Sequence, residues 1–114
     1  MKNFMKFLAG FLLVVLIVLD VAGQTVKLSG TVYDHNGAVI VGAKVIATDE
    51  AKKINETTTN QSGEYALELK PANYTLRFEA VGFKNMVWQD FRLVNSTKKA
   101  FNFDIVMEAG EPND

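Results

Sequence analysis

Few residues of this sequence have the types and spacing that catalysis requires. His35 is the single histidine, and cysteine is absent. A zinc site usually takes three or four ligands, mostly Cys and His, so carboxylates would have to complete a site at His35. The adjacent Asp34 and Asn36 are residue types that commonly form turns. We therefore interpret His35 as part of a turn, and we expect no metal site and no cofactor.

Candidate nucleophiles and acids also lack the partners that would activate them. Beyond the first segment the serines are Ser29, Ser62 and Ser96. Each has only His35 as a possible base, and none lies in a nucleophile-elbow sequence. Asp49 and Glu50 are adjacent in a polar segment, where solvated surface is the ordinary role of such acids. The sequence therefore predicts no catalytic residue and a protein that is not an enzyme.

Aromatic side chains offer a different chemistry, which is stacking and apolar contact. Trp88, together with Tyr33 and Met86, would form a platform for a sugar ring or an apolar partner if the three are exposed together. Packing in the core is the commoner role of such residues, and both interpretations remain open. The threonine-rich segment 54–59 could accept a partner strand at a sheet edge, although its polarity argues equally for blocking one.

Strands are the elements expected to position these residues. Apolar and polar residues alternate over residues 65–70 and again over 74–80, on either side of Pro71-Ala72-Asn73. Alternation with a period of two residues predicts strands that have one buried face. Because Pro and Asn favour turns, we expect these two strands to form an antiparallel hairpin.

The rest of the chain predicts further strands that cover the same apolar face. They are expected over residues 26–33, 43–48, 54–59, 83–93 and 101–107. The segment 54–59 suits a sheet edge, and Gly30 indicates a bulge or the close approach of another backbone. Apolar residues occupy both phases of 83–93, so this strand would be buried on two sides or expose Trp88. The short apolar connection 38–41 is expected to pack over one end of the core.

Turn residues separate the expected strands and complete the prediction of the fold. These residues are Gly37, Gly42, Gly63, Pro71 and Gly82. Seven short strands without helical periodicity predict a seven-stranded antiparallel β-sandwich of the Greek-key type. The inward positions predict a core of Val32, Val45, Tyr65, Leu67, Leu69, Tyr74, Leu76, Phe78, Phe101, Phe103 and Ile105.

Residues 1–23 are expected to be a signal peptide. Lys2 and Lys6 precede an apolar run over 7–19, and small residues follow at Val21-Ala22-Gly23. The run is shorter than the roughly 20 residues that span a bilayer, and a retained anchor is the alternative. Residues 24–108 would then form the domain of an exported protein that is periplasmic, extracellular or attached to the cell surface. A disordered acidic tail is expected over 109–114.

The overall charge bears on the possible partners. The formal net charge is −1, with 12 Lys and Arg interspersed among 13 Asp and Glu. Such a chain has no basic stripe to follow a phosphate backbone, so we expect no nucleic acid partner. Contact with a membrane is expected only through export or an uncleaved N-terminal segment.

Several segments together resemble a known family. They read G-T-V-Y-D-H-N-G (30–37), G-A-K-V (42–45), T-N-Q-S-G-E-Y (59–65), L-K-P-A-N-Y-T-L (69–76) and G-F (82–83). This pattern resembles the carboxypeptidase regulatory-like domain, a transthyretin-like (prealbumin-like) sandwich that is grouped with carbohydrate-binding-like folds. The family often has Gly where Ala72 lies here, which leaves Asn73 to adopt a left-handed conformation. It also often has Pro near Val39 or Ile40.

The resemblance implies a module without an activity of its own. In metallocarboxypeptidases the domain is an appendage of a zinc-binding catalytic domain, and similar bacterial modules occur on exported proteins and outer-membrane receptors. We therefore expect an exported, non-catalytic module for binding or structural support, with a protein or a glycan as its partner. The alternatives are a carbohydrate-binding module at Trp88 and a detached accessory domain of a peptidase or outer-membrane receptor system.

Overall fold

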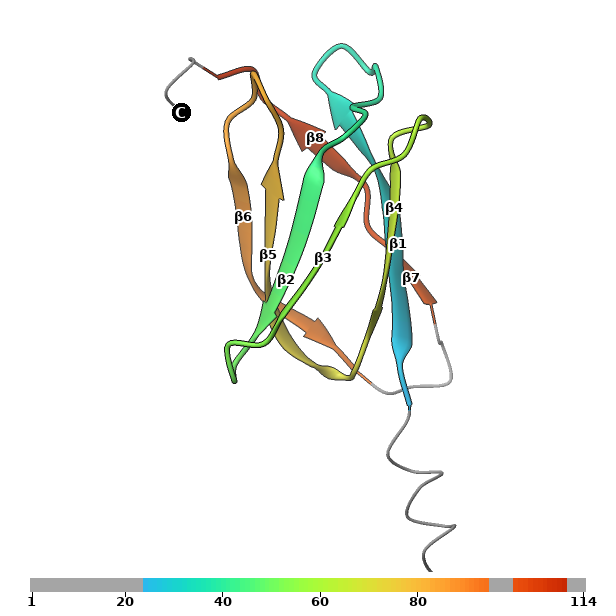
Figure 1. Cartoon of the computed structure of the whole chain (residues 1–114), viewed down its shortest axis with the longest axis vertical. Helices are drawn as coiled ribbons and strands as arrows, with labels where there is room; N and C mark the ends of the chain where they lie inside the picture. Colours follow the sequence, from blue (N-terminus) through green and yellow to red (C-terminus); the bar gives the residue numbers. More distant parts are fainter. Residues whose placement is uncertain (1–23, 95–99, 111–114) are drawn as a thin grey trace, which may run out of the picture.

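Eight strands in two sheets make up the computed structural model, which describes residues 24–94 and 100–110 (Figure 1). The strands are β1 (Val26–Asp34), β2 (Lys44–Asp49), β3 (Ile54–Thr58), β4 (Glu64–Leu69), β5 (Ala72–Glu79), β6 (Met86–Leu93), β7 (Ala100–Asn102) and β8 (Ile105–Met107). Within these described ranges, no helix is long and apolar enough to cross a membrane. The expected signal peptide, residues 95–99 and residues 111–114 of the expected tail lie outside the described residues.

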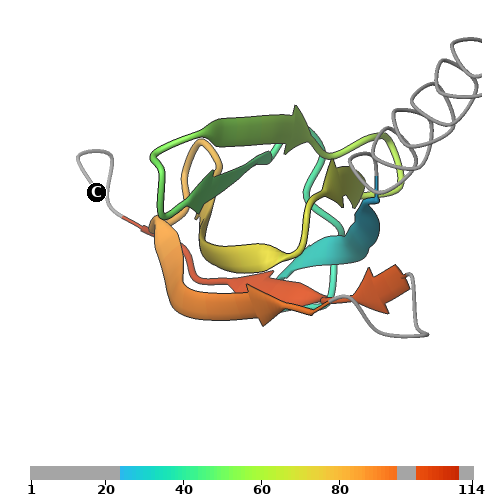
Figure 2. The same ribbon diagram turned by 90° about the horizontal axis from the view of Figure 1, so that it is seen from below.

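The two sheets face each other across one core. One sheet has the order β4-β1-β7, with β8 also paired to β1, and the other has the order β3-β2-β5-β6. Viewed from below in Figure 2, the strands surround a common centre. The protein is therefore the all-β sandwich that the alternation predicted, and segment 54–59 contributes an edge strand, β3, as expected.

The predicted hairpin between residues 65–70 and 74–80 is wrong. β4 pairs with β1, whereas β5 pairs with β2 and β6, so the chain crosses from one sheet to the other at Pro71. The Tyr74 hydroxyl donates a hydrogen bond to the Lys70 carbonyl oxygen at 2.6 Å across this crossing. Ala72 and Asn73 begin β5 and do not have positive φ. Alternation predicts which side chains are buried but not which strands are neighbours. A hairpin and a crossing between the two sheets bury the same side chains, so the pattern could not distinguish them.

The last expected strand is divided into β7 and β8, and both run parallel to β1. The division occurs at Phe103, whose carbonyl oxygen would lie 2.0 Å from a Cβ atom at Gly30. The same oxygen accepts a hydrogen bond from the Tyr65 hydroxyl at 2.6 Å, and the Asp104 carboxylate accepts one from the Thr31 N–H at 2.9 Å. Gly30 thus permits the close backbone approach that was predicted. The sandwich has eight strands rather than seven and is not wholly antiparallel.

A bulge explains the two apolar phases of β6. Met86 and Trp88 pair with Phe78 and Leu76, which are inward-facing. The register then shifts, and Asp90 adopts a left-handed conformation with φ 57°. This extra residue moves Phe91 to the same inward face. The strand is therefore buried from one side, and Trp88 is exposed, which agrees with the second of the two predicted alternatives.

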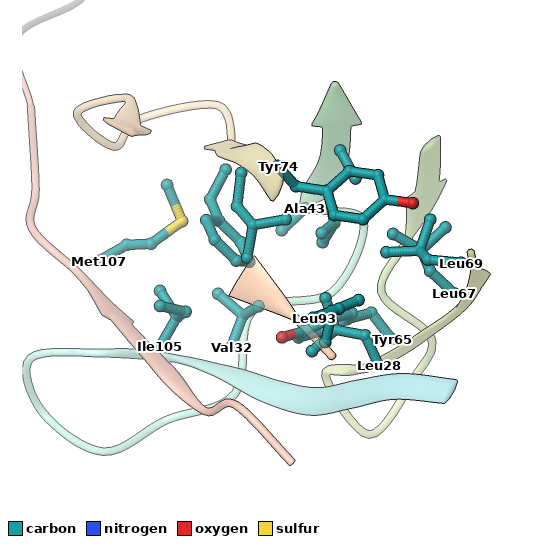
Figure 3. Packing of buried hydrophobic residues seen from close by; sticks show 14 of the residues in the cluster. Leu28, Val32, Ala43, Tyr65, Leu67, Leu69, Tyr74, Leu93, Ile105 and Met107 are labelled. Atoms are coloured by element: carbon teal, nitrogen blue, oxygen red, sulfur yellow. The ribbon is translucent and has the colours of Figure 1, made fainter. Parts of the chain in front are cut away.

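The core fills the space between the sheets, and Figure 3 shows part of it, with Val32 of β1 beside Ile105 of β8. Nine of the eleven predicted core residues are buried, whereas Phe101 and Phe103 are only partly buried. Core residues beyond that prediction are Val26, Leu28, Ile40, Ala43, Ala47, Leu93 and Met107. Phe78 is fully buried and meets the Tyr65 ring edge-on at 5.9 Å between centroids.

Only one residue of the apolar connection 38–41 packs over the core. Ile40 is buried, but Val39 and Val41 are exposed. The buried Thr59 hydroxyl donates a hydrogen bond to the Ile40 carbonyl oxygen at 2.6 Å and accepts one from the Ala43 N–H at 2.9 Å. These bonds fix Ile40 and leave its two neighbours on the surface. The connection therefore packs over the core through Ile40 alone, while Val39 and Val41 lie on the surface.

Residues 109 and 110, at the start of the expected tail, are paired with the rest of the fold. Ala109 forms a bridge with Phe83, and the Gly110 N–H donates a hydrogen bond to the Gly82 carbonyl oxygen at 3.0 Å. The Lys84 N–H donates to the Glu108 carbonyl oxygen at 2.9 Å. Residues 108–110 are thus paired with the β5–β6 connection through backbone hydrogen bonds. Apolar alternation in the sequence could not predict this pairing, because backbone hydrogen bonds do not require apolar side chains. The expected turn glycines, Gly37, Gly42, Gly63 and Gly82, all have positive φ.

Candidate functional site

One flank of the sandwich is lined by large apolar side chains. β6 is the edge of one sheet, and β7 with β8 is the edge of the other on the same side of the molecule. The inward-facing side chains between these edges define what we call the aromatic flank: Met86, Trp88, Phe91, Phe101 and Phe103. Four of these five are partly buried, whereas Trp88 is 45% exposed.

Phe103 is the centre of the aromatic flank. Its ring meets Trp88 edge-on, with centroids 5.2 Å apart and planes at 80°, and it meets Phe91 at 5.0 Å and 51°. Such edge-on and tilted pairs are favourable because the positive edge of one ring meets the negative face of another. The Tyr65 hydroxyl donates a hydrogen bond to the Phe103 backbone carbonyl oxygen. The exposed Trp88 therefore packs against a ring whose backbone is held by a hydrogen bond.

The structure does not assemble Trp88, Tyr33 and Met86 into one platform. Trp88 and Met86 share the inward face of β6. Tyr33 follows the buried Val32 on β1 and therefore faces the opposite side of its sheet, where it pairs with Val106. Tyr33 thus belongs to an outer surface with Val106 and Val39, to which it forms a bridge.

A shallow groove continues the aromatic flank toward the β5–β6 connection. Its volume is about 190 Å³, and its lining residues are Lys84, Asn85, Met86, Val106, Met107 and Glu108. Phe83 and Ala109, which form a bridge, are the chain neighbours of the lining residues Lys84 and Glu108. The groove and the aromatic flank together form a strip along the gap between the two sheet edges.

The edge of β6 differs from the edges of β3 and β4 in its charge. Residues 86–89 of β6 carry no charge, and Val87 and Trp88 are about half exposed on its two faces. By contrast, β3 carries Glu56, and β4 carries Glu64 and Glu68. Charged side chains protect edge strands from pairing with other chains. The first half of β6 lacks that protection.

The residues considered for catalysis do not form a site. His35 is exposed in a turn, where the Asp34 carboxylate accepts the N–H groups of Asn36 and Ala38 at 2.8 and 3.0 Å. Asp34 therefore acts as the turn former that the sequence indicated. In residues 24–94 and 100–110, no three His, Cys, Asp or Glu side chains gather as metal ligands. Ser96 lies outside the described residues.

Two buried tyrosines have altered ionisation but structural roles. Burial raises the pKa of Tyr65, and the negative charge of Asp104 adds to this effect. Burial also raises the pKa of Tyr74, with a smaller contribution from Asp49. Both hydroxyls therefore stay protonated and donate hydrogen bonds to backbone carbonyl oxygens.

Comparison with known proteins assigns the chain to a family. The profile of the family described as the carboxypeptidase regulatory-like domain matches residues 27–108. The chain belongs to this family. The match extends from β1 to the end of β8 and therefore includes the aromatic flank of this regulatory-like domain. No protein of curated function matches the chain.

Solved structures share the fold of this regulatory-like domain at low identity. Hydroxyquinol 1,2-dioxygenase from Pseudomonas putida is 13% identical, with a TM-score of 0.63 over 77% of this chain and 57% of its own. The dioxygenase domain of a dioxygenase carbohydrate-binding protein fusion from Streptomyces is 12% identical, with a TM-score of 0.60 over 77% and 82%. A Bacteroides uniformis protein named as a candidate carbohydrate-binding protein is 18% identical, with a TM-score of 0.61 over 75% and 42%.

These identities establish a common fold and nothing about activity. The domain spans little more than half of the Pseudomonas enzyme and less than half of the Bacteroides protein.

The aromatic flank itself was not anticipated as a unit, since Phe101 and Phe103 were assigned to the core. The sequence feature that could have revealed the flank is the presence of apolar residues in both phases of 83–93, because a change of phase within one strand indicates a bulge.

Proposed function

We propose that this carboxypeptidase regulatory-like domain is an exported, non-catalytic module that binds a partner protein at the aromatic flank. The observation that carries the proposal is Trp88, a half-exposed tryptophan supported by Phe103 on an uncharged sheet edge. Large aromatic residues in such positions dominate many protein interfaces. Export follows from the expected signal peptide at residues 1–23.

The edge of β6 suggests how a protein partner would bind. An extended segment could pair with the free backbone groups of residues 86–89, while its side chains contact Val87 on one face and Trp88 on the other. The bulge at Asp90 would end such pairing, because the ladder is interrupted there. The partner segment is therefore expected to be short, and the groove beside Met86 would extend its contact.

The proposal is tested by comparing variants as baits. Residues 24–114 are immobilised and exposed to envelope and secreted fractions of the source organism. We expect one retained species whose recovery falls about tenfold or more with Trp88→Ala, in line with the loss of an interface hot spot. Ile54→Ala is the matched control, because Ile54 is an exposed apolar residue on the edge strand β3.

Trp88→Phe separates binding from folding in this experiment. It keeps an aromatic ring against Phe103, so partial recovery of the retained species is expected. Equal retention by wild type, Trp88→Ala and Ile54→Ala would contradict the proposal. If the retained species is a peptidase or an outer-membrane receptor, the domain is a detached accessory domain of that system.

A carbohydrate-binding module is the second candidate function. The Bacteroides protein of similar fold is named as a candidate carbohydrate-binding protein, and Trp88 exposes enough surface to stack on a sugar ring. Because Trp88 is the single tryptophan, titration with soluble glycans can be followed by its fluorescence. A saturable change in fluorescence would favour the carbohydrate-binding function. Fluorescence that does not change with added glycan would favour the protein-binding function.

A further inference from the structure

The β1–β2 connection contains the single Asn-Gly pair of the chain, Asn36-Gly37. Both residues are exposed. Gly37 has φ 86°, and apart from Gly37 and its two chain neighbours no heavy atom lies within 4 Å of the position that a Cβ atom would occupy there. Among the described residues, the side chain of Asn36 has no hydrogen-bond partner. The carboxamide of Asn36 is thus free to rotate toward the following peptide nitrogen.

We propose that Asn36 is a covalent modification site, at which the chain converts its own asparagine through a succinimide with Gly37. The Gly37 nitrogen loses its proton and bonds to the Asn36 Cγ atom. The Cγ–Nδ2 bond breaks, and ammonia leaves with that proton. Water then opens one of the two imide carbonyl groups. The product is aspartate or isoaspartate, with one new carboxylate and no change of oxidation state.

The absence of a side chain at Gly37 makes this attack possible. The nitrogen can reach Cγ only if the main chain between the two residues rotates, and a Cβ atom on the second residue hinders that rotation. In the closed turn the Gly37 N–H donates to the Asp34 carbonyl oxygen at 3.0 Å. Reaction therefore requires this single bond to open, while the Thr59 hydroxyl still holds the connection at Ile40.

The other asparagines among the described residues lack this combination of features. The Asn60 side-chain oxygen accepts the N–H groups of Ser62 and Glu64 at 2.9 and 3.0 Å. Asn73 donates to Asp90 at 3.3 Å, and its side-chain oxygen is buried. Asn85 is also exposed, but Met86 follows it. Asn85 is therefore the matched comparison, since the residue that supplies the attacking nitrogen has a side chain at Met86 and none at Gly37.

Modification would change the turn in two ways. The new carboxylate lies two residues from Asp34, so two negative charges share one tight turn. Isoaspartate also adds a methylene group to the main chain between the N–H groups that Asp34 accepts at Asn36 and Ala38. At least one of these bonds must lengthen, so the modified protein is expected to melt at a lower temperature.

The test uses the full chain incubated in mildly alkaline buffer and then digested for peptide mapping by mass spectrometry. Asn36 is expected to convert progressively, with the mass change of amide to acid and a labelling signal for isoaspartate, while Asn85 stays unchanged in the same digest. Asn36→Gln is expected to abolish the signal. A second sample, kept unfolded in denaturant, gives the rate of Asn36 conversion in the absence of the folded turn.

The outcomes decide the proposal directly. Conversion of Asn36 in the folded protein, ahead of Asn85, supports it. Conversion in the unfolded sample alone would show that the Asp34 turn protects Asn36, and it would overturn the proposal. Equal conversion at Asn36 and Asn85 would also overturn it, because the glycine would then have no special role.

Discussion

Phe103 connects the interior of the sandwich with its candidate binding surface. Its ring supports Trp88, and its carbonyl oxygen is held by the Tyr65 hydroxyl above Gly30. A side chain at residue 30 would displace that oxygen, so the glycine and the tyrosine act together. The position of the exposed tryptophan therefore depends on residues that no partner would touch.

Tyr65→Phe tests this dependence. The substitution keeps the ring that packs on Phe78 but leaves the Phe103 carbonyl oxygen without its hydroxyl donor. We expect the free energy of unfolding to fall by about 1–2 kcal/mol, measured by urea denaturation. Tyr33→Phe is the control, because Tyr33 lies on the outer face of β1, and it should change stability little.

The ionisation of Tyr65 adds a dependence on pH. Its pKa in the folded protein is raised above the ordinary value of 10.0, so the folded state favours the protonated hydroxyl. The resulting stability is fully present below pH 10 and is lost as the pH rises through the raised pKa. Tyr65→Phe should therefore lose less stability than the wild type in alkaline buffer. An identical alkaline loss in both proteins would contradict this role.

At the scale of the elements, the bulge in β6 determines which side chains form the aromatic flank. Without the extra residue at Asp90, either Trp88 or Phe91 would face outward, because successive side chains of a strand alternate. The bulge also places Asp90 beside Asn73, whose amide donates to it at 3.3 Å. One irregular residue thus brings two aromatic rings onto Phe103.

Asp90→Val is expected to disturb this element. A β-branched residue is disfavoured at φ 57°, so we expect a loss of about 1–2 kcal/mol and a shift of Trp88 fluorescence as the phase of β6 changes. Asp90→Gly accommodates the same φ and should keep the wild-type spectrum. Gln89→Val, one residue earlier, should have little effect. A normal spectrum for Asp90→Val would show that the bulge does not set the flank.

At the scale of the whole molecule, the two ends of the sandwich are closed differently. The end that carries the β5–β6 connection is fastened by residues 108–110, which pair with Gly82, Phe83 and Lys84. At the opposite end the chain passes between sheets at Pro71, next to the Tyr74 hydroxyl. The pairing of residues 108–110 holds the end of β8 near the start of β6. It thereby fixes the end of the aromatic flank that carries Met86.

Truncation tests the contribution of this pairing. A chain that ends at Gly110 keeps every described hydrogen bond of the pairing and should melt as the full chain does. A chain that ends at Met107 loses the bonds made by Glu108 and Gly110, and we expect a loss of about 1–3 kcal/mol by thermal or urea unfolding. Similar stability of both truncated chains would show that the pairing is not needed.

The sequence predicted burial well because burial follows a local pattern. Alternation at Tyr65 and Leu67 identified their inward faces without knowledge of their neighbours. It could not predict that β4 and β5 lie in different sheets, because the identity of a neighbouring strand depends on the whole chain. The glycine at residue 30 did indicate a close backbone approach, since little else explains a glycine inside a strand.

The candidate site was predicted less completely than the fold. Trp88 and Met86 were named, but Tyr33 was grouped with them although β1 turns it to another surface. The left-handed conformation of Asp90 could not be read from its residue type, because aspartate occupies ordinary strand and turn conformations as well. Without that bulge, Phe91 and Phe103 could not be placed beside Trp88.

Photo-crosslinking at residue 88 tests the proposed binding surface most directly. A photoreactive aromatic residue replaces Trp88 in the full chain in its native cells, and a second variant carries the same group at Ile54 on β3. We predict one dominant crosslinked protein species from residue 88 and none of that mass from residue 54. The absence of any adduct at residue 88, or the same adducts from both residues, would contradict a partner site at the aromatic flank.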